Sequence, residues 1–308
     1  MVKENLPLVT IGVCVRNAAS TIREAIESII AQDYPHELME VIFVDDGSKD
    51  ETLSIIKKYA AQMDIRVRLF QHEWRGLGYS RNIVVDNAFG KYIIWVDGDM
   101  ILSKDHVRKQ VEFMEKHPEV AIGKGKCIFY TEHNIVAYLE DLMFIMEFSK
   151  DGFREIYKPL GTGGAIYRCK AIKEIGGFNQ KFGKACEDID VEAKVRSAGW
   201  VLCITPATFY ERRRSSWKSL WYEYFWHGSG GYTAKDAIKY SRSTLYRFFP
   251  LIAFLILFNY STDAYKKFRT KRVFLLPFHW FFKRTGWLMG FLIAYFNSKF
   301  KHLSISKF

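Results

Sequence analysis

Residues 91–99 read Lys-Tyr-Ile-Ile-Trp-Val-Asp-Gly-Asp, and the fold is organised around this stretch. The β-branched and aromatic residues 92–96 are typical of a buried strand, which ends at two carboxylates separated by Gly98. Because unpaired buried charges are costly, we expect Asp97 and Asp99 at the carboxyl edge of a sheet, where ligands bind. Hard oxygen ligands suit Mg²⁺ or Mn²⁺, whereas the alternative is a solvated Asp-Gly turn.

The first hundred residues repeat one pattern of a strand, a turn and a helix. Strands are predicted at residues 8–15, 41–44 and 67–70, and helices at 21–31, at 52–59 and in a segment ending at 88. This repeat predicts a parallel sheet with right-handed crossovers. The fold class is therefore α/β, with a mostly parallel, Rossmann-like central sheet.

The remaining chain is predicted to add further elements and then to change in composition. Helices are expected at 105–116, 135–148, 170–175 and 187–197, and strands at 120–129, 165–167, 200–204 and 208–210. An aromatic helix after Trp217 is expected to end near the glycine-rich residues 227–231. We predict a domain over residues 1–232 and a C-terminal helical region over 233–308.

The charge balance points to an anionic partner. Lys and Arg number 45 against 34 Asp and Glu, a net charge of +11. Much of the excess follows residue 210 among aromatic residues, which fits a membrane interface, and no nucleic-acid motif is found. The five cysteines form no CxxC pair, and residues 1–7 have no apolar signal sequence, so we expect reduced thiols facing the cytosol.

Three acidic clusters need a joint explanation. Asp45-Asp46 and Asp97-Gly98-Asp99 follow predicted strands, and Glu187-Asp188 begins a predicted helix. In a doubly wound sheet the first two clusters share the carboxyl edge, where a carboxylate and a metal can hold a nucleotide diphosphate. For Glu187 and Asp188, favourable electrostatics at a helix N-terminus is an alternative explanation.

The three acidic clusters are part of a set of motifs that is typical of a known family. It resembles glycosyltransferase family 2, the inverting transferases with the GT-A fold, over about residues 6–232. Six motifs occur in the family's order and at its usual separations. They are Val44-Asp45-Asp46-Gly47-Ser48-Lys49-Asp50-Glu51-Thr52, Gly78-Tyr79-Ser80-Arg81-Asn82, Asp97-Gly98-Asp99, Gly161-Thr162-Gly163-Gly164, Gly176-Gly177-Phe178 and Glu187-Asp188.

The resemblance implies a role for each matched position. Asp46 would hold the nucleobase with Asp45 beside it, and Arg81 would lie near the phosphates. Asp188 would be the catalytic base, and Glu187 beside it is the second catalytic candidate. The metal, Mg²⁺ or Mn²⁺, would bind Asp97 and Asp99, with Asp97 also facing the nucleotide. Further nucleotide contacts are expected at Val15 and Asn17, and acceptor-side candidates are Gly163, Gly164, Arg213, Arg214 and Trp217.

The implied reaction is a single displacement with inversion. A carboxylate takes the proton of an acceptor hydroxyl while the metal stabilises the departing diphosphate. We expect a UDP- or GDP-linked sugar donor, a lipid-linked saccharide acceptor and a location at the cytoplasmic face of the cell membrane. Processive synthesis is not expected, because residues 212–217 lack the Gln-x-x-Arg-Trp spacing. The alternatives are a polyprenyl-phosphate (dolichyl or undecaprenyl) glycosyl synthase and a non-catalytic nucleotide-binding module.

The C-terminal third carries apolar stretches at 248–258, 273–282 and 286–296. The first is shorter than the roughly 20 residues of a span, and Lys283-Arg284 interrupts the others. We therefore favour helices lying in the membrane interface, over one or two spans or a soluble helical domain. The bases expected near headgroups are Lys266, Lys267, Arg269, Lys271, Arg272, Lys283 and Arg284, and the boundary aromatics are Trp280, Phe281, Phe282, Trp287 and Tyr295.

Overall fold

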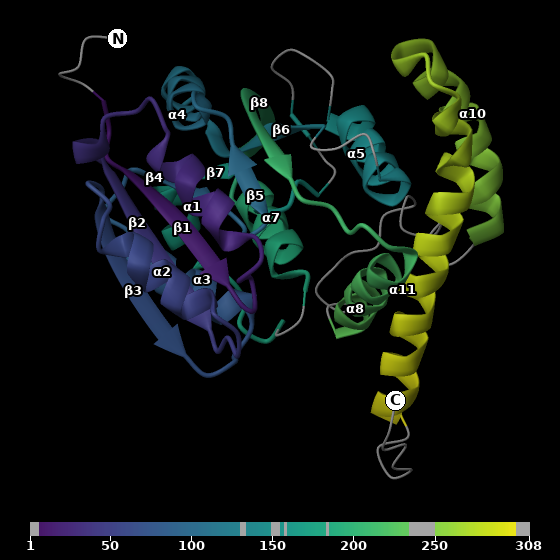
Figure 1. Cartoon of the computed structure of the whole chain (residues 1–308), viewed down its shortest axis with the longest axis horizontal. Helices are drawn as coiled ribbons and strands as arrows, with labels where there is room; N and C mark the ends of the chain where they lie inside the picture. The colour runs from purple at the N-terminus through teal and green to yellow at the C-terminus, as the bar shows by residue number, and fades with distance from the viewer. Residues whose placement is uncertain are drawn as a thin grey trace. The chain divides into compact units, whose positions relative to one another are not determined.

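The computed structural model describes residues 6–129, 134–148, 155–156, 159–182, 185–233 and 250–299 (Figure 1). The chain divides into two compact units. The first contains Met1–Tyr130, Glu147–Gly183 and Glu187–Arg212, and the second contains Thr131–Met146, Lys184–Cys186 and Arg213–Phe308. The predicted domain boundary at residues 232 and 233 stays a prediction, since residues 234–249 lie outside the described part.

The first unit is built on one eight-stranded sheet in the order β3-β2-β1-β4-β7-β6-β8-β5. Strands β1 to β4 pair in parallel, as do β6 and β8, whereas β7 is antiparallel to both of its neighbours and β5 is antiparallel to β8. This confirms the predicted α/β class with a mostly parallel sheet. The strands are β1 (Val9–Val15), β2 (Met39–Asp46), β3 (Arg66–His72), β4 (Tyr92–Trp95), β5 (Met100–Leu102), β6 (Val120–Ile128), β7 (Ala165–Arg168) and β8 (Val201–Glu211).

The register brings the first two of the predicted acidic clusters, Asp45-Asp46 and Asp97-Gly98-Asp99, to one edge of this sheet. Val15 of β1 lies opposite Asp45 of β2, and Gly12 of β1 lies opposite Trp95 of β4. Because β2 and β4 flank β1 on opposite sides, the strand order reverses at β1, which is where open α/β sheets bind ligands. All residues of β1, β2 and β4 are buried, as expected for central strands covered on both faces.

Six helices of the first unit cover the sheet and match the predicted positions to within a few residues. In α1 the apolar residues Ile22, Ala25, Ile26 and Ile29 recur at helical spacing and are buried. Helix α1 packs on α2, while α3 packs on α6 and α6 on α7. The six helices are α1 (Ile22–Ile30), α2 (Thr52–Ala60), α3 (Leu77–Asn87), α4 (His106–Lys116), α6 (Cys169–Glu174) and α7 (Glu187–Ser197).

Two strand predictions were wrong. The segments 200–204 and 208–210 form one strand, β8, which continues through the exposed Pro206. Opposite it the register shifts between Lys124 and Lys126, and such an irregularity accommodates a residue that has no N–H to donate. Strand β5 was missed because three residues at a sheet edge give no periodic pattern, and only the long-range pairing with β8 defines them.

The second unit consists of helices. They are most of α5 (Ile135–Phe148), then α8 (Trp217–Thr233), α10 (Pro250–Phe268), the short 3-10 helix η4 (Lys271–Leu275) and α11 (Leu276–Lys299). Helix α8 continues through the glycines at 228–231 that were expected to end it. A Cβ at Gly228 would overlap the Trp287 carbonyl, and one at Gly290 would overlap the Phe225 carbonyl. The glycines therefore allow α8 and α11 to approach closely.

Residues 273–275 of the second apolar stretch belong to η4, whereas the rest of that stretch and the whole of the third belong to a single helix, α11, which continues through Lys283-Arg284. The stretch at 248–258 begins outside the described residues and continues into α10. Throughout the described part of the chain, each helix is either too short or too polar to cross a bilayer.

Candidate active site

Asp45 and Asn17 hold together the loops that follow β2 and β1. Asp45 is fully buried and accepts hydrogen bonds from the backbone N–H and the hydroxyl of Ser48. Asn17 adopts a left-handed backbone (φ 53°), donates its own N–H to Ser48 Oγ at 2.9 Å and accepts the N–H of Lys49 at 2.8 Å. Val15 is buried and lies directly opposite Asp45 in the sheet. Their proposed contacts to a nucleotide stay predictions.

Asp46 organises the loop between β3 and α3. Its carboxylate accepts the backbone N–H groups of Arg75 at 2.7 Å and of Gly76 at 3.0 Å, and His72 Nδ1 lies 3.4 Å from Oδ1. Only 4% of Asp46 is exposed. The assignment of Asp46 to the nucleobase stays a prediction, and in this structure the carboxylate fixes the loop beside it.

The centre of the site is the guanidinium of Arg81 on α3. It donates to the carboxylate of Glu187 at the start of α7, and its Nη2 lies 3.9 Å from Asp97 Oδ1. Arg81 and Glu187 are almost completely buried, whereas the Asp97 side chain is 43% exposed. Burial lowers the pKa of Arg81, but the charges of Glu187, Asp97 and Asp188 raise it, and the net shift is upward. Arg81 is therefore a permanent cation that links two of the predicted acidic clusters.

Asp97 and Asp99 offer a suitable donor set for a divalent cation. They stand on either side of Gly98, where a Cβ would come within 2.9 Å of Ala18 and Val15, so only glycine fits this turn. No group of three or more His, Cys, Asp and Glu side chains converges on a metal position in the described residues. Two carboxylates are nevertheless what Mg²⁺ or Mn²⁺ uses when phosphates and water complete its shell.

A glycine turn at residues 161–164 lies next to both Asp97 and Asp188. A Cβ at Gly163 would come within 2.5 Å of Asp97 Oδ2, and a Cβ at Gly161 would lie 3.7 Å from Asp188 Oδ2. Gly164 has φ +69° and donates its N–H to Trp95 O at 2.8 Å. Asp188 is partly exposed, and its Oδ1 accepts the N–H of Ile189 at 2.8 Å.

Two buried ionisable residues that the sequence did not predict complete this turn. Lys124 of β6 donates to the Gly163 carbonyl, and burial lowers its pKa against the opposing charges of Glu211 and Asp97. Glu192 of α7 accepts the N–H groups of Leu160 and Gly161, both at 2.9 Å. The sequence feature that could have identified Lys124 is a lysine placed between two glycines in an apolar strand. No sequence feature distinguishes Glu192, because glutamate is common within helices.

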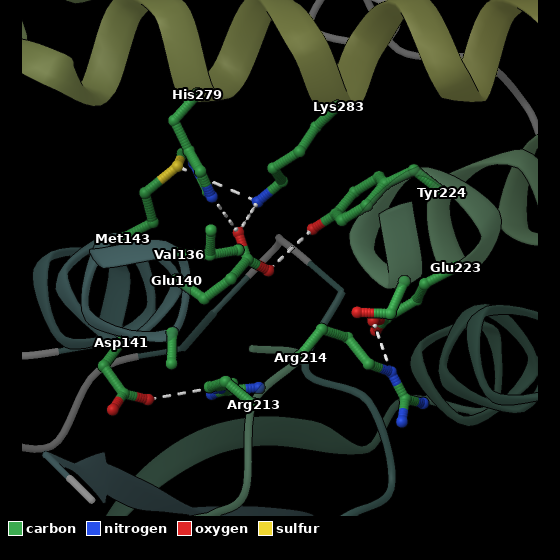
Figure 2. A network of polar contacts seen from close by, with 12 residues as sticks. Val136, Glu140, Asp141, Met143, Arg213, Arg214, Glu223, Tyr224, His279 and Lys283 are labelled. Atoms are coloured by element: carbon green, nitrogen blue, oxygen red, sulfur yellow. Dashed lines mark hydrogen bonds and ion pairs between the residues drawn. The ribbon is translucent and has the colours of Figure 1, made fainter. Parts of the chain in front are cut away.

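The remaining acceptor-side candidates, Arg213, Arg214 and Trp217, belong to the second unit. Figure 2 shows the contacts of Arg213 and Arg214. Arg213 Nε donates to Asp141 Oδ1 at 3.0 Å, and its guanidinium lies 4.0 Å from the centre of the Phe144 ring. Arg214 Nε donates to Glu223 at 2.9 Å. Trp217 is 41% exposed. Their role toward an acceptor stays a prediction.

The fold and the site together define an α/β domain of the GT-A type, with carboxylates gathered at the switch point of its sheet. The sequence profile described as glycosyl transferase family 2 matches residues 10–176, more than half of the 308-residue chain. The chain belongs to glycosyltransferase family 2.

Individual relatives match parts of the chain. It is 31% identical to EpsE of Bacillus subtilis over 188 residues, which make up 60% of this chain and 65% of EpsE. It is 32% identical to the poly(ribitol-phosphate) beta-N-acetylglucosaminyltransferase TarS of Staphylococcus aureus over 101 residues, 33% of this chain and 18% of TarS. The chain thus spans less than two thirds of the length of these relatives.

Solved structures show the same fold at low sequence identity. The mannosyltransferase PcManGT from Pyrobaculum calidifontis, in complex with GDP-Man and Mn²⁺, superposes with a TM-score of 0.67 and 18% identity, covering 96% of this chain and 88% of that one. Residues 1–349 of S. aureus TarS in complex with UDP superpose with a TM-score of 0.52 and 17% identity, covering 97% and 93%.

Glu192 gives a prediction about stability and pH. Burial, and then the charge of Asp188, raises the pKa of Glu192 from 4.5 to about 7. Between these values the folded protein holds a proton that the unfolded chain has lost, so this contribution to the free energy of unfolding falls as pH rises. Glu192→Gln keeps an acceptor for Leu160 and Gly161 but cannot ionise. Thermal melts between about pH 5 and about pH 8 should therefore show a smaller loss of stability in the variant.

The matched control is Glu37→Gln, which changes an exposed glutamate and should leave the pH dependence of the wild type intact. Melting curves for Glu192→Gln that run parallel to the wild type across this range would contradict the raised pKa.

Proposed function

We propose that this protein is an inverting, metal-dependent glycosyltransferase acting at the cytoplasmic face of the cell membrane. It moves a sugar from a UDP- or GDP-linked donor to a hydroxyl of a lipid-linked saccharide. The proposal rests mainly on the contacts of Arg81 with Asp97 and with Glu187 at the start of α7. Through them the candidate metal ligand Asp97 lies in the same site as Asp188, whose charge also acts on Arg81. Family membership supports the reaction class, and the GDP-Man, UDP-GlcNAc and Mn²⁺ bound in structural neighbours support the donor and the metal.

On this proposal the edge of the sheet binds the donor. Asp97 and Asp99 hold Mg²⁺ or Mn²⁺, which supplies positive charge for the departing diphosphate. Asp46 and Asp45 fix the loops on the nucleoside side. Arg81 keeps its charge at every relevant pH, so it adds a fixed positive potential beside Asp97.

Asp188 takes the proton of the acceptor hydroxyl. The acceptor oxygen forms a bond to the anomeric carbon as the bond from that carbon to the diphosphate breaks, and the configuration inverts. Glu187 is buried and bonded to Arg81, so its part is to position the first turn of α7. The partly exposed carboxylate of Asp188 is the one that a hydroxyl can reach.

The direct test measures hydrolysis of UDP- and GDP-linked sugars with Mg²⁺, with Mn²⁺ and with a chelator. We expect release of the nucleoside diphosphate from one nucleotide class, and only with metal present. Nucleotide binding without any hydrolysis or transfer would instead support the non-catalytic binding module.

The metal role predicts the effect of Asp99→Asn. The neutral amide is a weaker ligand for a hard cation, so binding of the nucleoside diphosphate should lose its dependence on Mn²⁺. Calorimetry with UDP or GDP, with and without Mn²⁺, measures this. The exposed Asp86→Asn on α3 is the control and should bind like the wild type. Unchanged metal-dependent affinity in Asp99→Asn would remove Asp99 from the metal site.

The catalytic role predicts the effect of Asp188→Asn. The variant keeps the size of the side chain and an oxygen that can accept the N–H of Ile189, so fold and donor affinity should be preserved. Single-turnover transfer to a hydroxyl acceptor should fall by about 10²–10⁴-fold, the usual effect of losing a positioned base.

Other outcomes of the same experiment have definite meanings. A loss of transfer below about threefold would reject Asp188 as the base, and would favour a lipid phosphate as acceptor because that nucleophile is already ionised. A parallel loss of donor affinity would show that Asp188 is structural.

A further inference from the structure

Helix α11 has two faces of different character. Its inner face is buried and includes Trp280, Lys283 and Trp287, together with the close approach to α8 at Gly290. Lys283 donates to Glu140 of α5, which also accepts the hydroxyl of Tyr224 at 3.2 Å (Figure 2). The expectation that Lys283, Trp280 and Trp287 face headgroups was therefore wrong, because these side chains fill the core of the second unit.

The residues that α11 contributes to the buried Glu140 network, His279 and Lys283, belong to its inner face. His279 lies beside Glu140 with its Nε2 at 3.1 Å, and burial lowers the pKa of His279 to about 3, so it is neutral. The ion pair of Glu140 and Lys283 is thus complete within α5 and α11. The outer face of α11 takes no part in the ion pair of Glu140 and Lys283.

The outer face of α11 carries an exposed apolar stripe. Its members are spaced by three, eight, three and four residues, which keeps them on one side of a helix. We define the outer stripe as Phe278 (61% exposed), Phe281 (36%), Met289 (43%), Leu292 (37%) and Phe296 (51%). The eight-residue interval is bridged by Thr285, whose hydroxyl donates to the Phe281 carbonyl at 2.9 Å. The one polar group on the stripe is therefore satisfied inside the helix.

Exposed bases precede the stripe in the chain. From the last turn of α10 to the start of α11 the exposed residues include five cations and no carboxylate. One of them, Lys266, pairs with Asp263 of the preceding turn at 3.2 Å. The five are Lys266, Lys267, Arg269, Lys271 and Arg272. Aromatic and aliphatic side chains next to a cluster of lysine and arginine are the combination that binds an anionic lipid interface.

We propose that the outer stripe of α11 lies in the headgroup region of an anionic membrane, with the bases at 266–272 on the lipid phosphates. This inference rests on the membrane location in the proposed function and specifies the surface responsible. The positive cluster favours a lipid surface over a second copy of the chain, whose identical cluster would repel it.

The test is co-sedimentation of the full chain with vesicles of two parts phosphatidylcholine to one part phosphatidylglycerol. The wild type should sediment with them. The triple variant Phe281→Gln, Leu292→Gln and Phe296→Gln should bind about 100-fold more weakly, because three apolar side chains no longer bury their surface in the lipid interface. A thermal melt of the triple variant, measured alongside, verifies that it is folded at the temperature of the assay. The control Phe89→Gln, an exposed phenylalanine of the first unit, should bind normally.

A second variant isolates the electrostatic part. Lys267→Glu with Lys271→Glu should weaken binding to these anionic vesicles by about 30-fold or more, and should leave binding to pure phosphatidylcholine unchanged. The same reversal at Lys57 and Lys58, exposed on α2, is the matched control and should have little effect.

Three results would overturn the inference. They are a wild type that does not sediment, a triple variant that binds as well as the wild type, and a wild-type dimer in light scattering that the triple variant dissociates. Donor hydrolysis is measured in the same samples without vesicles. Hydrolysis without vesicle binding would reject this inference and the membrane location on which it rests, but would leave the transfer reaction standing, whereas vesicle binding without hydrolysis would reject only the proposed activity.

Discussion

The first unit depends on one buried cation, Arg81. A guanidinium in a protein interior is tolerable only when carboxylates surround it, and removing one partner of such a pair costs about 3–5 kcal/mol. Arg81 meets this condition with Glu187, 106 residues later in the chain, and with Asp97 at the end of β4. Helix α3, the end of β4 and the start of α7 must therefore assemble together. The ion pair of Arg81 and Glu187 therefore stabilises the fold and also forms the centre of the candidate site.

Glycine allows the acidic groups to come this close. At Gly98 and Gly163 any side chain would collide with Val15 or with the Asp97 carboxylate, and at Gly164 it would collide with Phe209. The turn at 161–164 is then fixed from two sides, by Lys124 on its carbonyl and by Glu192 on its N–H groups. Such support from buried residues is what holds site residues within the narrow geometry that chemistry requires.

The second unit also contains a buried charge that is neutralised by a residue from a distant helix. Glu140 and Lys283 pair inside a helical core, and neutral His279 packs beside them. Lys283 lies on the inner face of α11 together with some of its apolar residues, while other apolar residues lie on the outer face. The aromatic and basic composition of the C-terminal third is therefore divided between a core, which uses Trp280 and Trp287, and a surface, which uses Phe278 and Phe296.

The sequence by itself determined the α/β class, most elements and the meeting of Asp45, Asp46 and Asp97 at one sheet edge, because hydrophobic periodicity and strand ends are local signals. It missed β5 and divided β8, since both depend on pairing between distant segments. Only the tertiary structure decided the partners of buried charges. Periodicity shows that a residue such as Lys124 or Lys283 lies in a strand or helix, but which carbonyl or carboxylate neutralises it depends on packing between elements far apart in the chain.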